Sequence, residues 1–243
     1  MEQKEWFASW FDTSYYHQLY SNRNEDEAKL FISNLLDLLK LDNSSKLLDL
    51  ACGKGRHAKT LNEFGYDVLG VDLSPNSISI ASELKNEHLD FQVHDMREPI
   101  HGKTFDAVFN LFTSFGYFDE TTDNERVCNA IAEMLKPDGI LVIDFMNAEK
   151  VIANLVSKEE KTVDNLTFHI TRRYDGKHIF KRIQFEDQGE KFDFTERVQA
   201  LKLKDFETLL ANQFRILHTF GSFDLNPFDA STSDRLIIIA QRK

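Results

Sequence analysis

Two glycines and two carboxylates stand close to one another near residue 50. Gly53 and Gly55 follow the apolar stretch 46–50, and Asp49 precedes the first glycine by four residues. Asp72 comes seventeen residues after Gly55, where a second apolar stretch ends. Glycines in such a turn let a ligand approach the main chain, and an acidic residue after the next strand can accept hydrogen bonds from both ribose hydroxyls. These residue types and spacings predict a site for a nucleoside-containing ligand.

Two interpretations of that ligand's identity are possible from the sequence, a dinucleotide or a cationic nucleoside derivative. Residues 53–58 fit the dinucleotide-binding pattern G-x-G-x-x-G/A, which would indicate a nicotinamide-dependent oxidoreductase. Two features oppose this alternative. Asp49 would repel a pyrophosphate and would suit a cationic ligand, such as an amino group or a sulfonium, and no second mononucleotide-binding half follows along the chain.

The site residues require alternating strands and helices to position them. Apolar runs predict five strands, at 46–50, 66–71, 89–93, 105–111 and 140–145. Nearly continuous apolar strands indicate a parallel sheet that is covered on both faces. Ligands of such sheets bind beyond the carboxyl ends of the strands, where the glycine turn lies.

A different pattern follows the fifth strand. Residues 161–200 alternate between apolar and polar, with Asp-Gly at 175–176 and Gln-Gly at 188–189, which predicts a three-stranded antiparallel insertion. A helix near 205–211 and strands at 214–220 and 236–240 then resume the α/β pattern. The expected parts are an N-terminal helical lid (1–23), a cofactor-binding α/β core (24–147), an antiparallel β insertion on the acceptor side (148–200) and the completion of the core (201–243).

Several short motifs, taken together, resemble those of class I S-adenosylmethionine-dependent methyltransferases. They are Asp49-x-Ala51-Cys52-Gly53-x-Gly55, Asp72, His94-Asp95-Met96-Arg97, Phe105-Asp106-Ala107-Val108 and Leu135-Lys136-Pro137-Asp138-Gly139. The resemblance covers residues from about 20 to 147 and the closing strands 214–240. It implies a doubly wound α/β fold, with a seven-stranded, mostly parallel sheet whose last strand is reversed. The segment 112–118 and the antiparallel insertion are similar to those of small-molecule members, namely sugar-amine N-methyltransferases and glycine N-methyltransferase-like enzymes.

The same resemblance implies S-adenosyl-L-methionine as the cofactor. Asp49 would hold its amino group and Arg23 its carboxylate, while Asp72 would bind the ribose diol and Asp95 the adenine amino group. The residues expected to contact the cofactor are Tyr16, Arg23, Asp49, Ala51, Gly53, Gly55, Asp72, Leu73, Asp95, Met96, Asn110 and Leu111. Lys54, between the two glycines, is expected to point to solvent.

Methyl transfer from a sulfonium is an in-line displacement, so the protein mainly aligns and desolvates the reactants. A base is needed only where the attacking atom must first lose a proton, and the catalytic residue stays open, with Tyr16, His94 and Tyr117 as candidates. No metal site is expected. The residues expected to form an aromatic wall for the acceptor are Tyr15, Tyr16, Phe112, Phe115, Tyr117 and Phe118, and the loop 221–229 is expected to fold over the acceptor.

Composition narrows the choice of partners. Lys plus Arg number 29 and Asp plus Glu 40, so the net charge of −11 disfavours nucleic acid. No apolar run approaches the roughly 20 residues of a membrane span, and the N-terminus lacks a signal-peptide pattern. Two cysteines make neither a disulfide framework nor a zinc set. We therefore expect a cytoplasmic monomer or homodimer that methylates a small-molecule acceptor, with an NAD(P)-dependent oxidoreductase or a non-catalytic S-adenosylmethionine-binding protein as alternatives.

Overall fold

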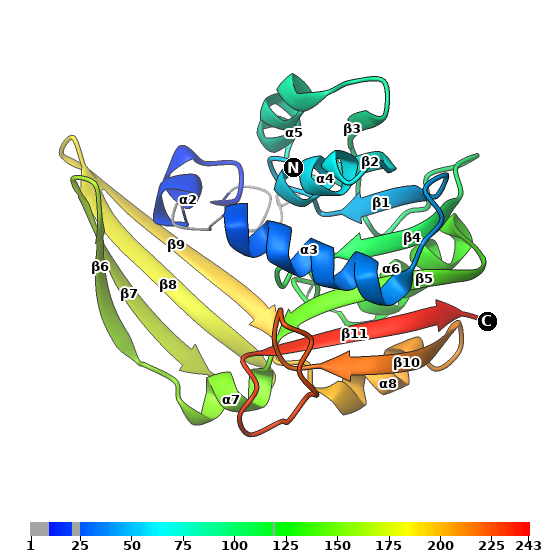
Figure 1. Cartoon of the computed structure of the whole chain (residues 1–243). Coiled ribbons are helices and arrows are strands. Elements are labelled where there is room, and N and C mark those ends of the chain that lie inside the picture. The colour runs from blue at the N-terminus through cyan, green and yellow to red at the C-terminus, as the bar shows by residue number, and fades with distance from the viewer. Residues whose placement is uncertain (1–9, 21–24, 119) are drawn as a thin grey trace.

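The strand that leads into the glycine turn lies near the centre of a seven-stranded sheet. The computed structural model describes residues 10–20, 25–118 and 120–243, and its strands follow the order β10-β11-β5-β4-β1-β2-β3 (Figure 1). Strands β1 to β5 run parallel, whereas β11 is antiparallel to both β5 and β10. This confirms the predicted seven-stranded sheet and its reversed last strand. The bounds are β1 Lys46–Leu50, β2 Asp67–Asp72, β3 Leu89–Val93, β4 Phe105–Asn110, β5 Leu135–Met146, β10 Phe214–Phe220 and β11 Arg235–Arg242.

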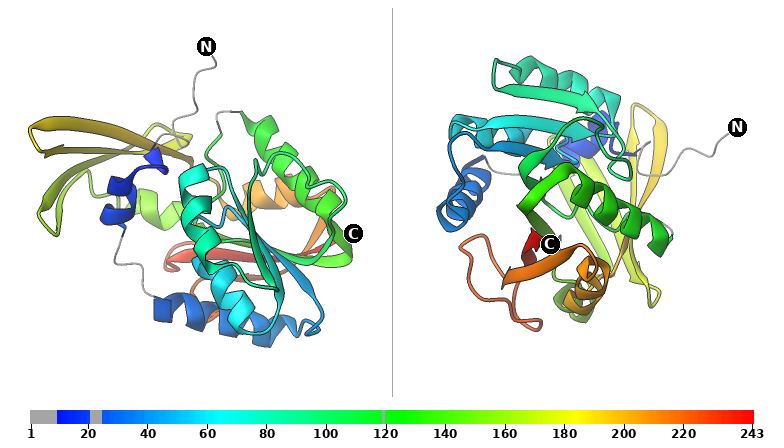
Figure 2. Two further views of the ribbon diagram at one scale, coloured as in Figure 1. Left: turned by 90° about the horizontal axis from the view of Figure 1, so that it is seen from above. Right: turned by 90° about the vertical axis from the view of Figure 1, so that its right-hand side faces the viewer.

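Helices cover both faces of this sheet (Figure 2). Helices α3, α4 and α5 pack on one face through residues such as Phe31, Ala58 and Ile78, and α6 and α8 pack on the other through Val127 and Phe206. The central strands are buried on both sides, which explains their nearly continuous apolar sequence. The helix bounds are α3 Glu25–Leu39, α4 Arg56–Glu63, α5 Pro75–Ala81, α6 Thr121–Met134, α7 Ala148–Ala153 and α8 Leu203–Leu210, with a 3-10 turn at Ser82–Leu84.

A second, antiparallel sheet stands beside the core in the order β6-β7-β8-β9 (Figure 1). It has four strands, so the prediction of three was wrong. The missed strand is β6, whose sequence Lys-Glu-Glu-Lys-Thr-Val lacks the apolar alternation of its neighbours. Charged residues are common on edge strands because they discourage pairing with other chains. The bounds are β6 Lys158–Val163, β7 Leu166–Tyr174, β8 His178–Asp187 and β9 Glu190–Gln199.

The N-terminal strap, which we define as residues 10–20, contains helix α2 (Ser14–Leu19) and lies between the second sheet and the core (Figures 1 and 2). Trp10 and Leu19 are buried with Phe168, Ile183 and other residues of the second sheet in a separate apolar cluster. This cluster ties together two segments that are about 150 residues apart in the sequence. Within the described ranges, no helix is long and apolar enough to cross a membrane.

Candidate functional site

A cavity of about 500 Å³ opens at the carboxyl ends of β1, β2, β3 and β4. This is the edge where a doubly wound sheet binds its ligands. The strap closes its other side. The lining residues are Phe11, Tyr16, His17, Tyr20, Leu50, Ala51, Cys52, Gly53, Lys54, Arg56, His57, Asp72, Leu73, Ser77, His94, Asp95, Met96, Leu111, Phe112, Ser114, Tyr117 and Phe118.

The turn between β1 and α4 needs its glycines for different reasons. Gly55 has φ +82°, and a Cβ atom there would lie 2.6 Å from Cε1 of Phe91. Gly53 has φ +56°, and a Cβ atom there would have no neighbour within 4 Å, since the residue faces open space. Gly55 therefore lets the turn pack against the sheet, while Gly53 leaves main chain accessible from the cavity.

Asp72 is held by the same turn. Its Oδ2 accepts a hydrogen bond from Gly53 N at 2.9 Å, and its Oδ1 accepts one from Ser74 N at 2.8 Å. Burial raises the pKa of Asp72, and these backbone donors oppose that effect. Because a carboxylate oxygen accepts more than one hydrogen bond, the fixed carboxylate can still receive two hydroxyl groups from the cavity.

Asp49 lies in the floor of the site and is not among the cavity-lining residues. Its side chain is 1% exposed, and Oδ2 has no hydrogen-bond partner within the described part of the chain. Burial raises the pKa of Asp49 to about 7, although the backbone N–H of Ala58 and the charge of Arg56 act in the opposite direction. A buried carboxylate oxygen without a partner is costly, and a cation nearby would offset that cost.

The turn after β3 contributes Asp95 beside His94 and Met96. Arg97 donates to both oxygens of Asp95, with Nε 3.0 Å from Oδ1 and Nη2 2.6 Å from Oδ2. Burial acts to raise the pKa of Asp95, but the bonds from Arg97 outweigh it and lower the pKa overall. The same guanidinium lies 4.7 Å from the ring centre of Phe118. Asp95 is thus fixed in its charged form at the cavity wall.

The turn after β4 is strained. Phe112 and Thr113 both adopt left-handed φ angles, of 63° and 61°, which are unfavourable for residues with a β-carbon. The buried Asp144 holds this turn, because its Oδ2 accepts from Phe112 N at 2.8 Å and its main-chain oxygen accepts from Thr113 N at 2.8 Å. Arg235 Nε donates to the other carboxylate oxygen at 2.7 Å, and the result is a fixed aromatic wall.

The strap is anchored both to the core and to the second sheet. On the core side, Asp12 Oδ1 accepts from Ser74 Oγ at 2.5 Å, and its Oδ2 accepts from Asn76 Nδ2 at 2.8 Å. On the side of the second sheet, Glu196 accepts from Trp10 Nε1 at 2.7 Å and from Tyr20 OH at 2.8 Å. These anchors span the cavity and hold the strap's aromatic rings against it.

The structure brings most of the predicted site residues together. Those that line the cavity are Tyr16, Ala51, Gly53, Asp72, Leu73, His94, Asp95, Met96, Leu111 and Tyr117. Three others stand behind the lining: Asp49, Gly55, and Asn110, which is fully buried and donates to Leu50 O at 3.0 Å. Asn110 was expected to contact the cofactor, but it does not line the cavity. Arg23 lies outside the described residues.

Two of the candidate catalytic residues, Tyr117 and His94, each donate a hydrogen bond to a main-chain carbonyl. Tyr117 OH donates to Thr113 O at 2.6 Å. His94 Nε2 lies 2.7 Å from Glu98 O, and a carbonyl only accepts, so this nitrogen is the donor. His94 follows β3, beside Asp95, and is therefore near the carboxylate expected to meet adenine.

Four further expectations were wrong, three about the acceptor side and one about Lys54 in the glycine turn. Tyr15 packs on the second sheet against Phe185, and Phe115 is buried against Phe206, since both rings fill apolar cores. Lys54 lines the cavity instead of pointing away, and burial lowers its pKa. The loop 221–229 contributes no lining residue, because its Phe223 packs on helix α3, with the ring centres of Phe223 and Phe31 4.5 Å apart.

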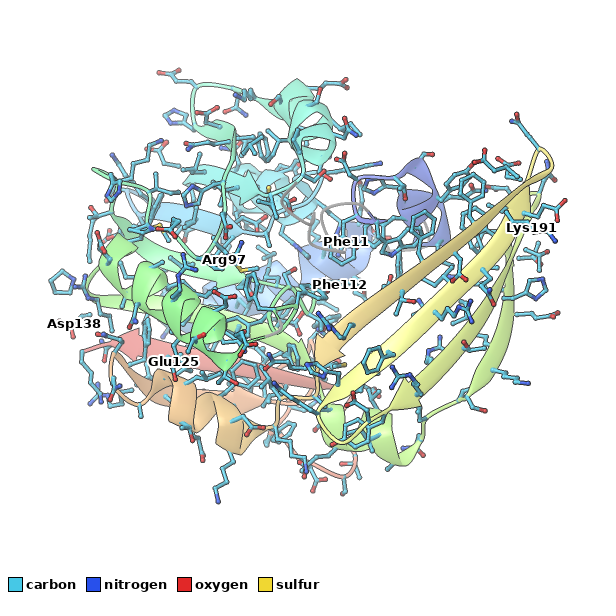
Figure 3. The ribbon with its side chains drawn as sticks, turned by 180° about the vertical axis from the view of Figure 1, so that it is seen from behind. Phe11, Arg97, Phe112, Glu125, Asp138 and Lys191 are labelled. Atoms are coloured by element: carbon cyan, nitrogen blue, oxygen red, sulfur yellow. The ribbon has the colours of Figure 1, made fainter. Side chains whose placement is uncertain are left out.

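The second sheet likewise contributes no lining residue within the described ranges, and acts on the cavity through the strap that it holds. Sequence reasoning missed the strap's Phe11 and Tyr20 as lining residues (Figure 3 labels Phe11 and Phe112 where the two sheets meet). The aromatic residues of this segment were visible in the sequence, but nothing local ties them to the glycine turn.

Comparison with known proteins agrees with this geometry. Residues 48–143 match a family described as a methyltransferase domain. The chain is 28% identical over 240 residues to "Putative methyltransferase YqeM" of Bacillus subtilis, covering 94% of this chain and 95% of the relative. It is 34% identical over 134 residues to dTDP-3-amino-3,4,6-trideoxy-alpha-D-glucopyranose N,N-dimethyltransferase of Streptomyces venezuelae, covering 53% of this chain and 54% of that relative. The chain thus spans about half the length of the sugar enzyme.

Among solved structures, an S-adenosylmethionine-dependent methyltransferase from Clostridium acetobutylicum has the same fold. Its TM-score is 0.78 at 19% identity, covering 93% of this chain and 95% of the other. The matched domain contains the strands that carry the cavity, so the chain is a methyltransferase. Residues 48–143 match the methyltransferase-domain family, and the chain shares its fold with S-adenosylmethionine-dependent methyltransferases.

Proposed function

We propose that this methyltransferase transfers the methyl group of S-adenosylmethionine to the nitrogen of a small-molecule amine. The observation that carries the proposal is that two kinds of residue line the cavity: fixed carboxylates and accessible main chain from the turns after β1, β2 and β3, and aromatic rings from the strap and the turn after β4. The sugar relative of Streptomyces venezuelae, whose name describes N,N-dimethylation of an amino sugar, supports an amine.

The carboxylates and the neighbouring residues of the strand-end turns fit the cofactor. We assign the ribose diol to Asp72, the adenine amino group to Asp95, and the side of the adenine ring to Leu73 and Met96. The α-amino group is assigned to Asp49, because the unpartnered Oδ2 of this buried carboxylate calls for a cation. When bound, the cofactor supplies an electrophilic methyl carbon on a sulfonium.

The aromatic residues that line the cavity fit an amine acceptor. Phe11, Tyr16, Phe112 and Tyr117 present rings that favour a cationic or apolar group and exclude water. Tyr117 OH donates a hydrogen bond to Thr113 O. The phenol oxygen can in turn accept a hydrogen bond from an N–H of the amine substrate. This would hold the nitrogen lone pair in line with the methyl group, so we assign Tyr117 to positioning the acceptor.

The transfer itself needs little from the protein. The amine lone pair forms the new N–C bond, the S–C bond breaks with its electrons staying on sulfur, and the ammonium product then loses a proton to water. Alignment and desolvation supply the acceleration, and no strong base is required for a neutral amine. We therefore assign no general base to Tyr16 or His94.

The location and partners follow from the same proposal. A small-molecule acceptor suits an enclosed cavity, and the net charge of −11 disfavours a nucleic-acid substrate. We propose a cytoplasmic monomer or homodimer without a membrane partner. The strap, the core and the second sheet are proposed to serve as lid, cofactor-binding part and support of the lid, respectively.

The test combines binding and turnover. Titration calorimetry should show binding of S-adenosylhomocysteine and none of NAD⁺ or NADP⁺, and mass spectrometry should detect methyl transfer to members of an amine panel that includes amino sugars. The Tyr117→Phe variant should reduce turnover while keeping cofactor affinity. Binding of the nicotinamide dinucleotides alone would favour the oxidoreductase alternative, and cofactor binding without transfer to any amine would overturn the proposed acceptor.

A further inference from the structure

The cavity contains a basic side chain that the expected cofactor contacts leave unused. This inference rests on the cofactor site proposed above. We propose that Arg56, the first residue of helix α4, binds the carboxylate at the methionyl end of the cofactor. Arg56 is thereby a specificity-determining residue that separates the full cofactor from nucleosides lacking the amino acid group.

The position of Arg56 places its charge inside the site. It directly follows Gly55 and lines the cavity. Its Cζ lies 5.5 Å from the ring centre of Phe112, and its Nη2 lies 3.2 Å from Nε2 of His57. The guanidinium therefore stands between the glycine turn and the strained turn after β4, on the same strand-end edge as Asp72.

The carboxylate and amino group of the methionyl end are bonded to one carbon, so their protein partners must lie close together. Asp49, assigned to the amino group, is 1% exposed and has an unpartnered Oδ2. Arg56 is the basic side chain whose charge acts on Asp49, lowering the pKa that burial raises. A cation beside this carboxylate, with its own face on the cavity, provides the complementary half of a zwitterion site.

The local backbone favours an anion at the same place. Helix α4 begins after Gly55, which supplies no side-chain cap, and its first turn contains no acidic residue. The positive end of the helix therefore lies at the turn that borders the cavity, where a carboxylate is stabilised. A guanidinium adds two parallel donors in the geometry that a carboxylate accepts.

Among the described residues Lys54 is the competing cation, since it also lines the cavity; Arg23, to which the family resemblance gives this carboxylate, lies outside them. Its ammonium is a single point charge on a flexible chain, and its lowered pKa follows from burial alone. Arg56 is favoured because its charge reaches Asp49 and its fork matches a carboxylate. Lys54→Met therefore serves as a variant that separates the two possibilities.

The experiment compares two ligands by titration calorimetry on the full chain. S-adenosylhomocysteine carries the amino acid group, and 5′-methylthioadenosine lacks it but keeps the adenosyl part. Arg56→Met should weaken S-adenosylhomocysteine about 10- to 100-fold, the range expected for loss of a charge-assisted hydrogen bond, and change methylthioadenosine less than about twofold. Arg56→Lys should recover part of the loss. Lys59→Met, an exposed position on the same helix, is the matched control.

The outcomes separate cleanly. Equal weakening of both ligands in Arg56→Met would assign a structural role to Arg56. Unchanged S-adenosylhomocysteine binding in Arg56→Met would assign the carboxylate to Lys54 if Lys54→Met shows the loss, and to Arg23 if it does not. Either result overturns the inference. If Arg56→Met does not fold, Arg56→Gln and Arg56→Lys give the same comparison. Failure of both ligands to bind the unmodified protein would instead reject the proposed cofactor site.

Discussion

The two sides of the cavity are built from different kinds of contact. The strand-end side consists of the turns after β1, β2, β3 and β4, and hydrogen bonds between neighbouring turns fix it, such as Gly53 N to Asp72. The strap side consists of residues 10–20, and side chains far away in the sequence, such as Glu196, hold it. A rigid sheet edge can keep cofactor contacts in place while a separately anchored segment opens and closes. From this difference we propose that recognition and access are controlled by different residues.

The largest expected effect is the pH dependence that Asp49 gives to the strand-end side. Burial raises the pKa of this carboxyl from 3.8 to about 7 in the folded protein. The folded state then binds a proton more tightly than the unfolded state, so the free energy of unfolding falls as pH rises from about 4 to about 7. The loss is at most about 4 kcal/mol. Urea denaturation at pH 5 and pH 8 measures it.

Asp49→Asn isolates this contribution from the other titrating groups. The variant should be less sensitive to pH than the unmodified protein, and the gap between their free energies of unfolding should change between pH 5 and pH 8. Saturating S-adenosylhomocysteine should flatten the slope of the unmodified protein, since its amino group would pair with the ionised carboxylate. Parallel pH profiles of the free energy of unfolding in the two proteins would show that Asp49 does not cause the pH dependence.

Gly55→Ala tests whether the strand-end side depends on its backbone. The substitution places a Cβ atom 2.6 Å from Phe91 and requires a left-handed φ of +82°. Overpacking and backbone strain together should lower the free energy of unfolding by about 3 kcal/mol. Gly65→Ala is the matched control, with φ +96° and no atom within 4 Å of the added Cβ. Chemical denaturation should show a clearly smaller loss there, and equal losses would exclude a role for the Phe91 contact.

Asp72→Ala tests ligand recognition on the same side. It removes the acceptor of Gly53 N and the proposed partner of the ribose diol, so the Kd for S-adenosylhomocysteine should rise about 100-fold. Asp67→Ala changes a half-exposed carboxylate at the opposite end of β2 and should leave the Kd unchanged. Titration calorimetry of both variants decides the point. Similar affinities for Asp72→Ala and the unmodified protein would remove Asp72 from the site.

The strand-end side could be predicted from the sequence because its determinants are local. Gly53 lies three residues after β1 and Asp72 is the last residue of β2, and parallel strands bring their carboxyl ends to one edge. The reversed strand at 236–240 was also anticipated through the family resemblance. The sequence predicted less well which individual residues line the cavity. Asn110, for example, donates to Leu50 O within the sheet, because side chains alternate in direction along a strand.

The strap side could not be predicted in the same way. Tyr15 and Tyr16 are adjacent in the sequence, yet Tyr15 packs on Phe185 of the second sheet and Tyr16 lines the cavity. Only the tertiary arrangement separates these roles. Strand β6 was missed for a related reason, since its charged sequence follows from its position at an edge and not from an apolar pattern.

Asp12→Ala gives the smallest effect and tests whether the strap controls access. It removes the acceptor of Ser74 Oγ and Asn76 Nδ2, the bonds that tie the strap to the core. Loss of about 1 kcal/mol of anchoring should raise the dissociation rate of S-adenosylhomocysteine about fivefold, and faster entry should keep the change in Kd smaller than that. Stopped-flow fluorescence measures both rates. Asp187→Asn, which weakens the Tyr15 hydrogen bond on the second sheet, should have less effect because Tyr15 does not line the cavity. Unchanged rates in Asp12→Ala would mean that ligands enter without displacing the strap, and the two sides would then form one fixed wall.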